Sequence, residues 1–367
     1  MKVPDFLGKK PDHFYIIRNS VLSLRCRYMS LLPLYGGVFL AALLLTWIIK
    51  NQAIRLHLLD APIARSAHSR PIPRGGGVSI SLLFAISALY FFLEGIIPTE
   101  EFLALTAAFV IALLGILDDL FTLRLRWRIT VQLLAAIWVV YWLGGVAPID
   151  FGFFRLTNPL LLSIMGILAL IWLLNLYNFM DGIDGIATTE LLFVNVMSLF
   201  IVINSSDPVA SHLSAVLLSA GAGFLVWNWP PAKIFLGDVG SSFIGFVLGI
   251  LALLTMQHGS LTVWTWFILL GVFVVDATFT LLVRYISGQR WFEGHASHAY
   301  QNAAREYKSH AKVTISIVTI NCLWLAPLAL LSVERPEFGF LICVVALAPL
   351  ILLALRFKAG KLIDFAN

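Results

Sequence analysis

The sequence predicts an all-α integral membrane protein that crosses the bilayer about eleven times. Of its 367 residues, 60% are apolar and 12% are charged, whereas a soluble domain usually carries about 25% charged residues. Apolar runs near the ~20 residues that a spanning helix needs follow one another along nearly the whole chain. They leave no room for a separate soluble domain.

The expected spans are bounded by charged or turn-forming residues. Several are short for a full crossing, so tilt or a shifted boundary is expected. They cover about residues 31–49, 76–93, 102–117, 129–144, 159–177, 186–204, 212–227, 240–257, 262–283, 313–333 and 338–355. Because no low-complexity linker or fixed-period repeat separates them, residues 29–367 are predicted to form one transmembrane domain.

The connections between the spans alternate in charge. Connections 94–101, 145–158, 205–211, 258–261 and 334–337 contain only Arg155 and Arg335 as basic residues. The other connections and the carboxyl-terminal tail contain seventeen. Since Lys and Arg concentrate in cytoplasmic loops, the sequence predicts a cytoplasmic carboxyl terminus and an amino terminus outside.

Residues 1–28 disagree with this orientation. They hold six basic residues, yet would lie outside, and they lack the apolar core of a signal peptide. Our interpretation is that Met29 is the natural start and that the leader is a mis-called extension. The alternative is a short interfacial segment.

Composition also excludes two other classes of protein. The three cysteines are an odd number, and Cys322 and Cys343 lie inside apolar runs, so a disulfide scaffold is excluded. The basic residues do not share one soluble face, so a nucleic-acid partner is not expected.

Polar side chains gather at the predicted cytoplasmic ends of the spans. A carboxylate near hydrocarbon depth is costly unless it is compensated. Five aspartates therefore predict a bound divalent cation, and Mg²⁺ takes one or two carboxylates together with substrate phosphates. The set comprises Asp118, Asp119, Asn175, Asn178, Asp181, Asp184, Asn228 and Asp238, with His295 and His298 in a later connection on the same face.

Asp118 and Asp119 close the apolar run GILDDL. Adjacent residues on a helix do not share a face, so the two carboxylates are expected to do different work. One would bind the metal and the other would contact the substrate. The alternative is two helix-end carboxylates that are solvated or paired with Arg124, Arg126 and Arg128.

The segment NLYNFMDGIDGIA, residues 175–187, gives the sharper signal. Asp181 and Asp184 lie three residues apart, and Asn175 and Asn178 repeat that spacing, which places side chains on one face of a helix. The glycines let the backbone leave the helix or approach a ligand closely. The alternative is an ordinary turn at the membrane exit.

The segment WNWPPAKIFLGDVGSS, residues 227–242, contains an isolated carboxylate. Asp238 is predicted to be the third carboxylate arm of the metal site, with Asn228 at the start of the same connection. The alternative for Asp238 is a helix N-terminal cap.

Two histidines three residues apart lie in GQRWFEGHASHAYQ, residues 288–301. With no third soft ligand nearby, a zinc site is not expected. His295, His298 and Arg290 are instead predicted to meet a phosphate through charge or hydrogen bonds.

Two further features carry basic or acidic groups. Arg65 and Arg74 lie in the first inner loop, which ends in Gly75–Gly77, and a glycine run before a helix can cradle phosphate. Anionic lipid headgroups are the alternative partner of these arginines. Asp276 lies within an apolar span and is either a functional group or a helix-packing group that pairs with Thr280.

Together these motifs resemble the polyprenyl-phosphate N-acetylhexosamine-1-phosphate transferases, the MraY/WecA-like family also called glycosyltransferase family 4. The resemblance runs from about Leu59 to Gln301. The family's double aspartate matches Asp118 and Asp119, its DGxDG motif matches residues 175–185, and its N-x-x-P-A…F-x-G-D motif matches residues 228–238. The form His295-Ala-Ser-His298 resembles the bacterial branch that starts O-antigen or related surface glycans, and departs from the peptidoglycan enzyme.

The resemblance implies an Mg²⁺-dependent enzyme (Mn²⁺ as the alternative ion) in the bacterial cytoplasmic membrane, with its active site on the cytoplasmic face. Undecaprenyl phosphate would attack a UDP-N-acetylhexosamine and release UMP. Asp238 and Asp118 would hold the metal, and Asp119 would contact or deprotonate the lipid phosphate. The remaining site residues would hold nucleotide, sugar or phosphate: Asp181, Asp184, Asn175, Asn178, Asn228, His295, His298, Arg65, Arg74, Arg290 and Asp276.

The sequence leaves the sugar open and favours GlcNAc or a 6-deoxy HexNAc such as FucNAc or QuiNAc. It also leaves the oligomeric state open. A secondary transporter is the main alternative function, but transporters place carboxylates near the bilayer midplane, often within inverted repeats. In this sequence the acidic residues of the motifs are predicted to lie at one face of the membrane. A nucleotide-sugar binding or scaffold protein without catalysis is the second alternative.

Overall fold

The computed structural model describes residues 13–56, 59–60, 71–121, 123–205, 207–290 and 295–361. Within them the regular secondary structure is helical apart from two short antiparallel strand pairs, in which β1 pairs with β2 and β3 with β4. The first half contains α1 (His13–Arg55), β1 (Leu59–Asp60), β2 (Ile72–Pro73), α2 (Val78–Leu93), α3 (Thr99–Phe121), α4 (Leu125–Trp142), β3 (Ile149–Asp150), β4 (Arg155–Leu156) and α5 (Pro159–Met180).

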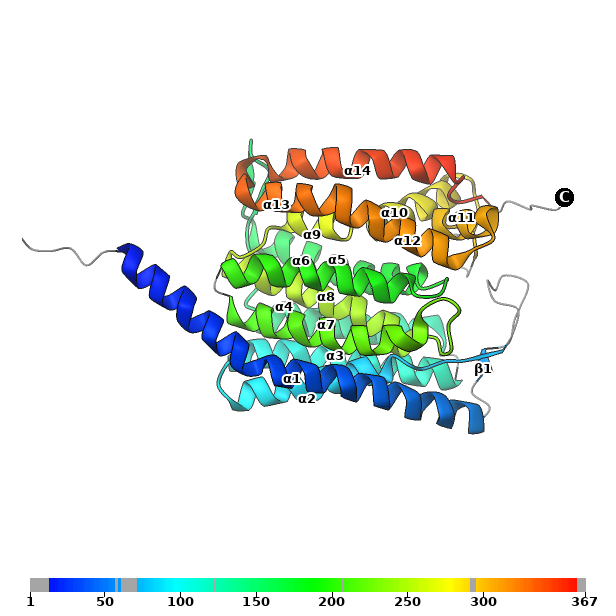
Figure 1. Ribbon diagram of the computed structural model, residues 1–367. Helices are drawn as coiled ribbons and strands as arrows, with labels where there is room; N and C mark the ends of the chain where they lie inside the picture. The colour runs from blue at the N-terminus through cyan, green and yellow to red at the C-terminus, as the bar shows by residue number, and fades with distance from the viewer. Residues whose placement is uncertain are drawn as a thin grey trace, which may run out of the picture.

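The second half completes the bundle (Figure 1). It contains α6 (Ile186–Asn204), α7 (Pro208–Asn228), α8 (Asp238–His258), α9 (Val263–Leu269), α10 (Gly271–Ile286), α11 (Ala299–Tyr307), α12 (His310–Ile320), the π-helical turn η1 (Asn321–Leu325), α13 (Ala326–Glu334), the 3₁₀ turn η2 (Pro336–Phe338) and α14 (Gly339–Arg356).

The predicted fold class is confirmed. In the described part of the chain, eight helices are long and apolar enough to cross a membrane, or nine if the bent pair α9–α10 counts as one span. The shorter apolar helix α2 and the arginine-bearing α4 occupy two of the other expected spans. The protein is therefore an all-α polytopic membrane protein, and its orientation stays a prediction.

The expected span 262–283 is two helices that meet at 82°. Gly271 begins α10 in close contact with α14, where an added Cβ would lie 2.9 Å from Leu347. Three polar residues four positions apart (Asp276, Thr280 and Arg284) are buried on α10. A polar face of this kind is favourable only when it is buried against protein rather than lipid.

Helix α8 lies at the centre of the bundle. In the most apolar part of α8, 89% of residues are buried, compared with 17% in α1. Gly245 and Gly249 let α8 approach α5 closely, because a Cβ on Gly245 would lie 2.6 Å from the carbonyl oxygen of Leu173. Small residues are the usual means of close helix contact in membranes.

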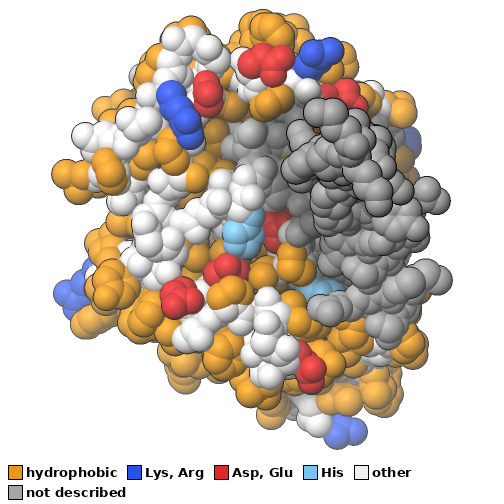
Figure 2. All heavy atoms as spheres, turned by 90° about the vertical axis from the view of Figure 1, so that its left-hand side faces the viewer, with side chains coloured by type: hydrophobic (Ala, Val, Ile, Leu, Met, Phe, Trp, Pro, Cys, Tyr) orange, Lys and Arg blue, Asp and Glu red, His pale blue; other side chains and the backbone are white. Residues whose placement is uncertain are grey.

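The two ends of the bundle carry different elements and different side chains. β1, α11 and the carboxyl-terminal end of α14 lie at one end, on the right of Figure 1. Figure 2 shows the opposite end, where histidine and acidic side chains lie near the middle of the face. Residues 1–12 of the predicted leader lie outside the described residues, and α1 is helical from His13, so the choice of Met29 as the start stays a prediction.

Candidate active site

The end of α3 and the start of α8 are joined by one carboxylate. The backbone N–H groups of Asp238 and Val239 donate to the two carboxylate oxygens of Asp119, each at 3.2 Å. Gly237 precedes α8 and has no side chain with which to cap it. Asp119, predicted to contact the lipid phosphate, therefore accepts from the first turn of a neighbouring helix, where a negative charge is favourable.

Arg74 reaches the same point from the first inner loop. Its guanidinium donates to the backbone carbonyl of Asp119 and lies 3.9 Å from the Asp119 carboxylate. The side chain is 39% exposed, so part of the guanidinium faces solvent. Arg65, the other predicted arginine of this loop, lies outside the described residues.

Asp118 and Asp238 lie side by side. Their carboxyl groups are within hydrogen-bonding reach of each other. Asn178 Nδ2 donates to Asp238 Oδ1 at 2.8 Å, and Arg128 Nη1 lies 2.9 Å from Asp118 Oδ2. The arginine pairing considered from the sequence is thus present for Arg128, while Asp118 also faces the other acids.

Asp181 follows the last turn of α5 and completes the cluster. Burial, followed by the negative charges of Asp238, Asp119 and Asp184, raises the pKa of Asp181 to about 7. Burial disfavours the charged carboxylate, and the nearby negative charges add to that effect. We call Asp118, Asp119, Asp181 and Asp238 the acidic cluster.

The acidic cluster fits a divalent cation that substrate helps to coordinate. Among the described residues, no three His, Cys, Asp or Glu side chains are arranged to enclose a metal by themselves. Mg²⁺ usually takes one or two protein carboxylates and completes its octahedron with water and phosphate oxygens. The adjacent carboxylates of Asp118 and Asp238 meet that requirement.

Asp184 lies beside the acidic cluster, but its carboxylate contacts neighbouring segments of the protein. Its Oδ2 accepts the N–H of Ala232 at 3.0 Å, and its Oδ1 lies 3.3 Å from His310 Nδ1. Thr314 donates to the Asp184 carbonyl at 3.1 Å. His310 was not among the predicted site residues, because the only sequence signal was a histidine at a predicted inner helix start.

Two predicted asparagines have partners within the protein. Asn175 donates to Gln132 Oε1 on α4 at 3.0 Å. Asn228 accepts from Thr188 at 2.9 Å and donates to the carbonyl of Ile234 at 3.1 Å, with 2% of its surface exposed. These contacts order the helices around the cluster, and contact with substrate stays a prediction for both.

The glycine run before α2 serves packing. The N–H groups of Gly76 and Gly77 donate to the carbonyls of Phe235 and Leu236. A Cβ on Gly77 would lie 2.2 Å from the Cα of Gly240. Since these two N–H groups have protein acceptors, they are not available to a phosphate, and the run lets the first inner loop lie against the start of α8. A phosphate contact of this loop stays a prediction.

The two histidines stack on each other, with ring centroids 4.9 Å apart. His298 is buried and its Nδ1 lies 3.2 Å from Asp276 Oδ1. Burial, followed by the neighbouring His298 and Arg284, lowers the pKa of His295 to about 3. His295 is therefore a neutral imidazole at ordinary pH. Arg290 is exposed, and its backbone carbonyl accepts from Arg284.

Tyr300 connects the histidines to the acidic cluster. Its hydroxyl donates to the carbonyl of Phe179 at 3.0 Å, two residues before Asp181, and the ring of Phe179 stacks near His298 with centroids 6.3 Å apart. A Cβ on Gly182 would lie 2.1 Å from this hydroxyl. The glycine therefore allows α11 to lie against the turn that carries Asp181.

Comparison with known proteins places these residues in a wider context. A sequence model described as Glycosyl transferase family 4 matches residues 102–256, which include the whole acidic cluster and end before the histidines. The chain is 32% identical over 294 residues to the probable undecaprenyl-phosphate N-acetylglucosaminyl 1-phosphate transferase of Bacillus subtilis, covering 78% of this chain and 80% of that protein.

Two further relatives have related names. The chain is 28% identical over 270 residues to the undecaprenyl-phosphate alpha-N-acetylglucosaminyl 1-phosphate transferase of Thermotoga maritima, covering 72% of this chain and 80% of that protein. It is 27% identical over 295 residues to the phospho-N-acetylmuramoyl-pentapeptide-transferase of Desulfatibacillum aliphaticivorans, covering 70% of this chain and 79% of that protein.

Proposed function

We propose, on the premise that this chain belongs to glycosyl transferase family 4, that it transfers N-acetylhexosamine 1-phosphate from a UDP-sugar to undecaprenyl phosphate. The observation that carries the proposal is the acidic cluster, in which the ends of α3, α5 and α8 bring four carboxylates together. The names of two relatives specify undecaprenyl phosphate and N-acetylglucosamine 1-phosphate, which makes UDP-GlcNAc the first donor to test.

In the proposed reaction, an oxygen of the lipid phosphate attacks the β-phosphorus of the UDP-sugar. The bond from that phosphorus to the oxygen shared with the α-phosphate breaks, and UMP leaves. The sugar remains on the lipid through a pyrophosphate. Because both reactants are anions, the protein must hold them in line against their mutual repulsion.

Asp118 and Asp238 would hold Mg²⁺. When bound, Mg²⁺ would supply positive charge that offsets the negative charge developing on UMP. Asn178 orients Asp238 through its 2.8 Å hydrogen bond. Arg128 offsets part of the negative charge of Asp118 at 2.9 Å. His298, with His295 stacked on it, lies beside Phe179 and would meet a phosphate oxygen.

Asp119 is assigned a positioning role, because both of its carboxylate oxygens accept N–H groups of α8. A phosphate monoester has its second pKa near ~6, so the attacking lipid phosphate is largely dianionic at pH 7 without a base. Asp119 would therefore act by keeping Asp238 in place.

The proposed setting is the bacterial cytoplasmic membrane, with the acidic cluster on the cytoplasmic face where UDP-sugars are found. The product would start an O-antigen of lipopolysaccharide or a related surface glycan. GlcNAc or a 6-deoxy HexNAc such as FucNAc or QuiNAc is the expected sugar.

The test is UMP release by purified protein in detergent, with undecaprenyl phosphate, Mg²⁺ or Mn²⁺ and a panel of UDP-HexNAc donors, each with and without EDTA. Metal-dependent UMP release with one donor is expected. Asp238→Asn should abolish it, whereas Asp150→Asn, at the opposite end of the bundle, should not. Folded protein that releases no UMP with any donor would contradict the proposal and favour a transporter.

A further inference from the structure

The carboxylate of Asp276 collects four donors from the protein. Oδ1 accepts from Thr280 Oγ1 at 3.1 Å, from the N–H of Ala299 at 3.0 Å and lies 3.2 Å from His298 Nδ1. Oδ2 accepts the N–H of Tyr300 at 2.8 Å. Asp276 is 5% exposed. Its carboxylate thus ties α10 to the first turn of α11 and to one imidazole.

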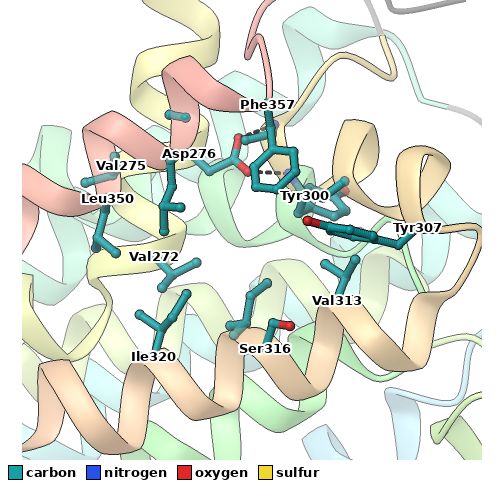
Figure 3. Close-up of a pocket in the computed structure, with 15 residues that line it drawn as sticks. Val272, Val275, Asp276, Tyr300, Tyr307, Val313, Ser316, Ile320, Leu350 and Phe357 are labelled. Atoms are coloured by element: carbon teal, nitrogen blue, oxygen red, sulfur yellow. Dashed lines mark hydrogen bonds between the residues drawn. The ribbon is translucent and has the colours of Figure 1, made fainter. Parts of the chain in front are cut away.

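The other side of Asp276 is mostly apolar (Figure 3). A cavity of about 250 Å³ lies among α10, α11, α12 and α14, and its walls include Val272, Val313, Ile317 and Leu350. The described residues that line it include no Lys or Arg. Because a buried carboxylate needs compensation, the N-terminal N–H groups of α11 and the imidazole supply most of it here.

We propose that Asp276 is a positioning residue that acts through His298. With Nδ1 facing the carboxylate, Nδ1 carries a proton in either charge state of the ring, which leaves Nε2 as the nitrogen available to a phosphate oxygen. The role of Asp276 is then distinct from direct substrate binding, and this role rests on the proposed function.

The same helix turn also contacts the segment that carries Asp181. Tyr300, whose N–H is held by Asp276, donates its hydroxyl to the carbonyl of Phe179. The α11 turn therefore spans the distance from α10 to the segment that carries Asp181. A change at Asp276 should alter where His298 points before it alters the acids, because His298 touches the carboxylate directly.

The test is a double-mutant cycle on the rate of UMP release. Asp276→Asn keeps the size of the side chain but presents an amide N–H₂ to donors, and the rate is expected to fall about 10–100-fold with KM for the UDP-sugar little changed. In protein that already carries His298→Ala, the same substitution should change the rate by about twofold or less. An equal loss in both backgrounds would overturn the proposal, because Asp276 would then act independently of His298.

Thr280→Val is the matched control. It removes one donor to Asp276 but leaves the contacts of the carboxylate with His298, Ala299 and Tyr300. Its rate should stay close to wild type, while a loss as large as that of Asp276→Asn would indicate general disruption of α10. Thermal unfolding of every variant in detergent shows whether it is folded.

A second readout does not depend on activity. In ¹⁵N-histidine NMR of the wild-type protein without substrate, the signals lost in His298→Gln identify His298. A protonated Nδ1 is expected, and a bare Nδ1 would overturn the proposal even if the enzyme is active. If Nδ1 is protonated but no donor yields UMP, the proposed function fails while the geometry assigned to Asp276 stands.

Discussion

The carboxylate of Asp119 caps the helix that begins with Asp238, through an N–H···O hydrogen bond of 3.2 Å. The two residues are 119 positions apart in sequence, and this contact fixes them side by side. An acid that lies next to another acid normally repels it. Here the backbone N–H groups of α8 neutralise part of the charge of Asp119, which lets Asp238 lie close by with its own carboxylate directed to Asn178.

Substitution of Asp119 tests whether its carboxylate positions α8 or acts as a general base. Asp119→Asn retains one acceptor oxygen for α8, so a measurable rate is expected, reduced about 10–100-fold as for other groups that orient a metal ligand. Its pH–rate profile should resemble that of wild type. Asp119→Ala removes both acceptors and should also cost about 0.5–2 kcal/mol of stability, as the loss of a helix cap does.

The measurement is UMP release between pH 5.5 and 9, together with thermal unfolding of each variant. If Asp119→Asn is inactive while folded, or loses one limb of the pH profile, Asp119 is a base and the positioning role is wrong.

The contact between Gly182 and Tyr300 predicts a steric effect on activity. A Cβ at position 182 would lie 2.1 Å from the Tyr300 hydroxyl and 2.8 Å from Gln301 Nε2, so Gly182→Ala should push α11 away from the acidic cluster. A displacement of about 1 Å can lower a rate about 100-fold. Gly37→Ala is the control, because nothing lies within 4 Å of a Cβ there.

Removing the clashing atom should restore part of the activity. Tyr300→Phe deletes the hydroxyl, so the Gly182→Ala/Tyr300→Phe double variant is expected to release UMP faster than Gly182→Ala alone. A double variant that is slower than both single variants would show that the hydroxyl is needed for more than its position.

His295 predicts a specific dependence of stability on pH. In the folded protein, burial and the neighbouring His298 and Arg284 lower its pKa to about 3, whereas an unfolded histidine titrates near ~6.5. Between these values the unfolded state binds more protons, so stability decreases as pH falls from about 6.5 toward 3. His295→Gln should remove this contribution and make the unfolding temperature less sensitive to acid.

The neutral form of His295 also has a consequence for catalysis. Because His295 stays neutral, His295→Gln should leave the shape of the pH–rate profile between pH 5.5 and 8 unchanged, even if the rate decreases. A pH–rate limb near 6 that disappears in His295→Gln would show that His295 titrates in the working enzyme.

The sequence predicts that the aspartates at the helix ends lie near one another, and the reason is physical. A spanning helix has a nearly fixed length, so the apolar runs fix where each helix ends, and polar residues at alternate ends must share one face of the membrane. Asp118 at the end of one run and Asp238 at the start of another were expected to meet, and their carboxyl groups do lie within hydrogen-bonding reach.

The partners of these acids were not predictable in the same way. The pairing of Asp184 with His310 joins residues 126 positions apart, and helix packing in three dimensions decides it. The break before Gly271 was missed because an apolar run does not reveal whether it is straight. The glycine run at 75–77 has the composition of a phosphate loop, but only the structure shows Gly76 and Gly77 donating to residues 235–236.

The opposite end of the bundle contains a charged group that the acidic site does not use (Figure 2). His258 at the end of α8 lies between two carboxylates, with Nδ1 3.0 Å from Asp207 Oδ2 and Nε2 3.0 Å from Glu101 Oε1. Both ring nitrogens face acceptors, and only the imidazolium has two N–H donors. Ser260 also donates to Asp207, at 2.7 Å. This arrangement joins the start of α3, the start of α7 and the end of α8.

His258→Gln should therefore destabilise the protein without changing its chemistry. Glutamine is neutral, and its two N–H donors share one nitrogen, so it cannot replace the charged donors on opposite sides of the ring. The expected loss is about 1.5–3 kcal/mol, as for a hydrogen bond to a charged group. Burial alone would raise the pKa of Asp207, but hydrogen bonds from His258 and Ser260 hold it below its usual value. The stabilisation that Asp207 provides is thus present above pH ~4 and is lost as the pH falls through its folded-state pKa. Thermal unfolding from pH 6 to about 2 should show a gap between wild type and His258→Gln that narrows only below pH ~4, while UMP release by folded protein near neutral pH stays equal. A gap that persists unchanged to the acid end of this range would mean that His258 stabilises the three helices by packing rather than by charge.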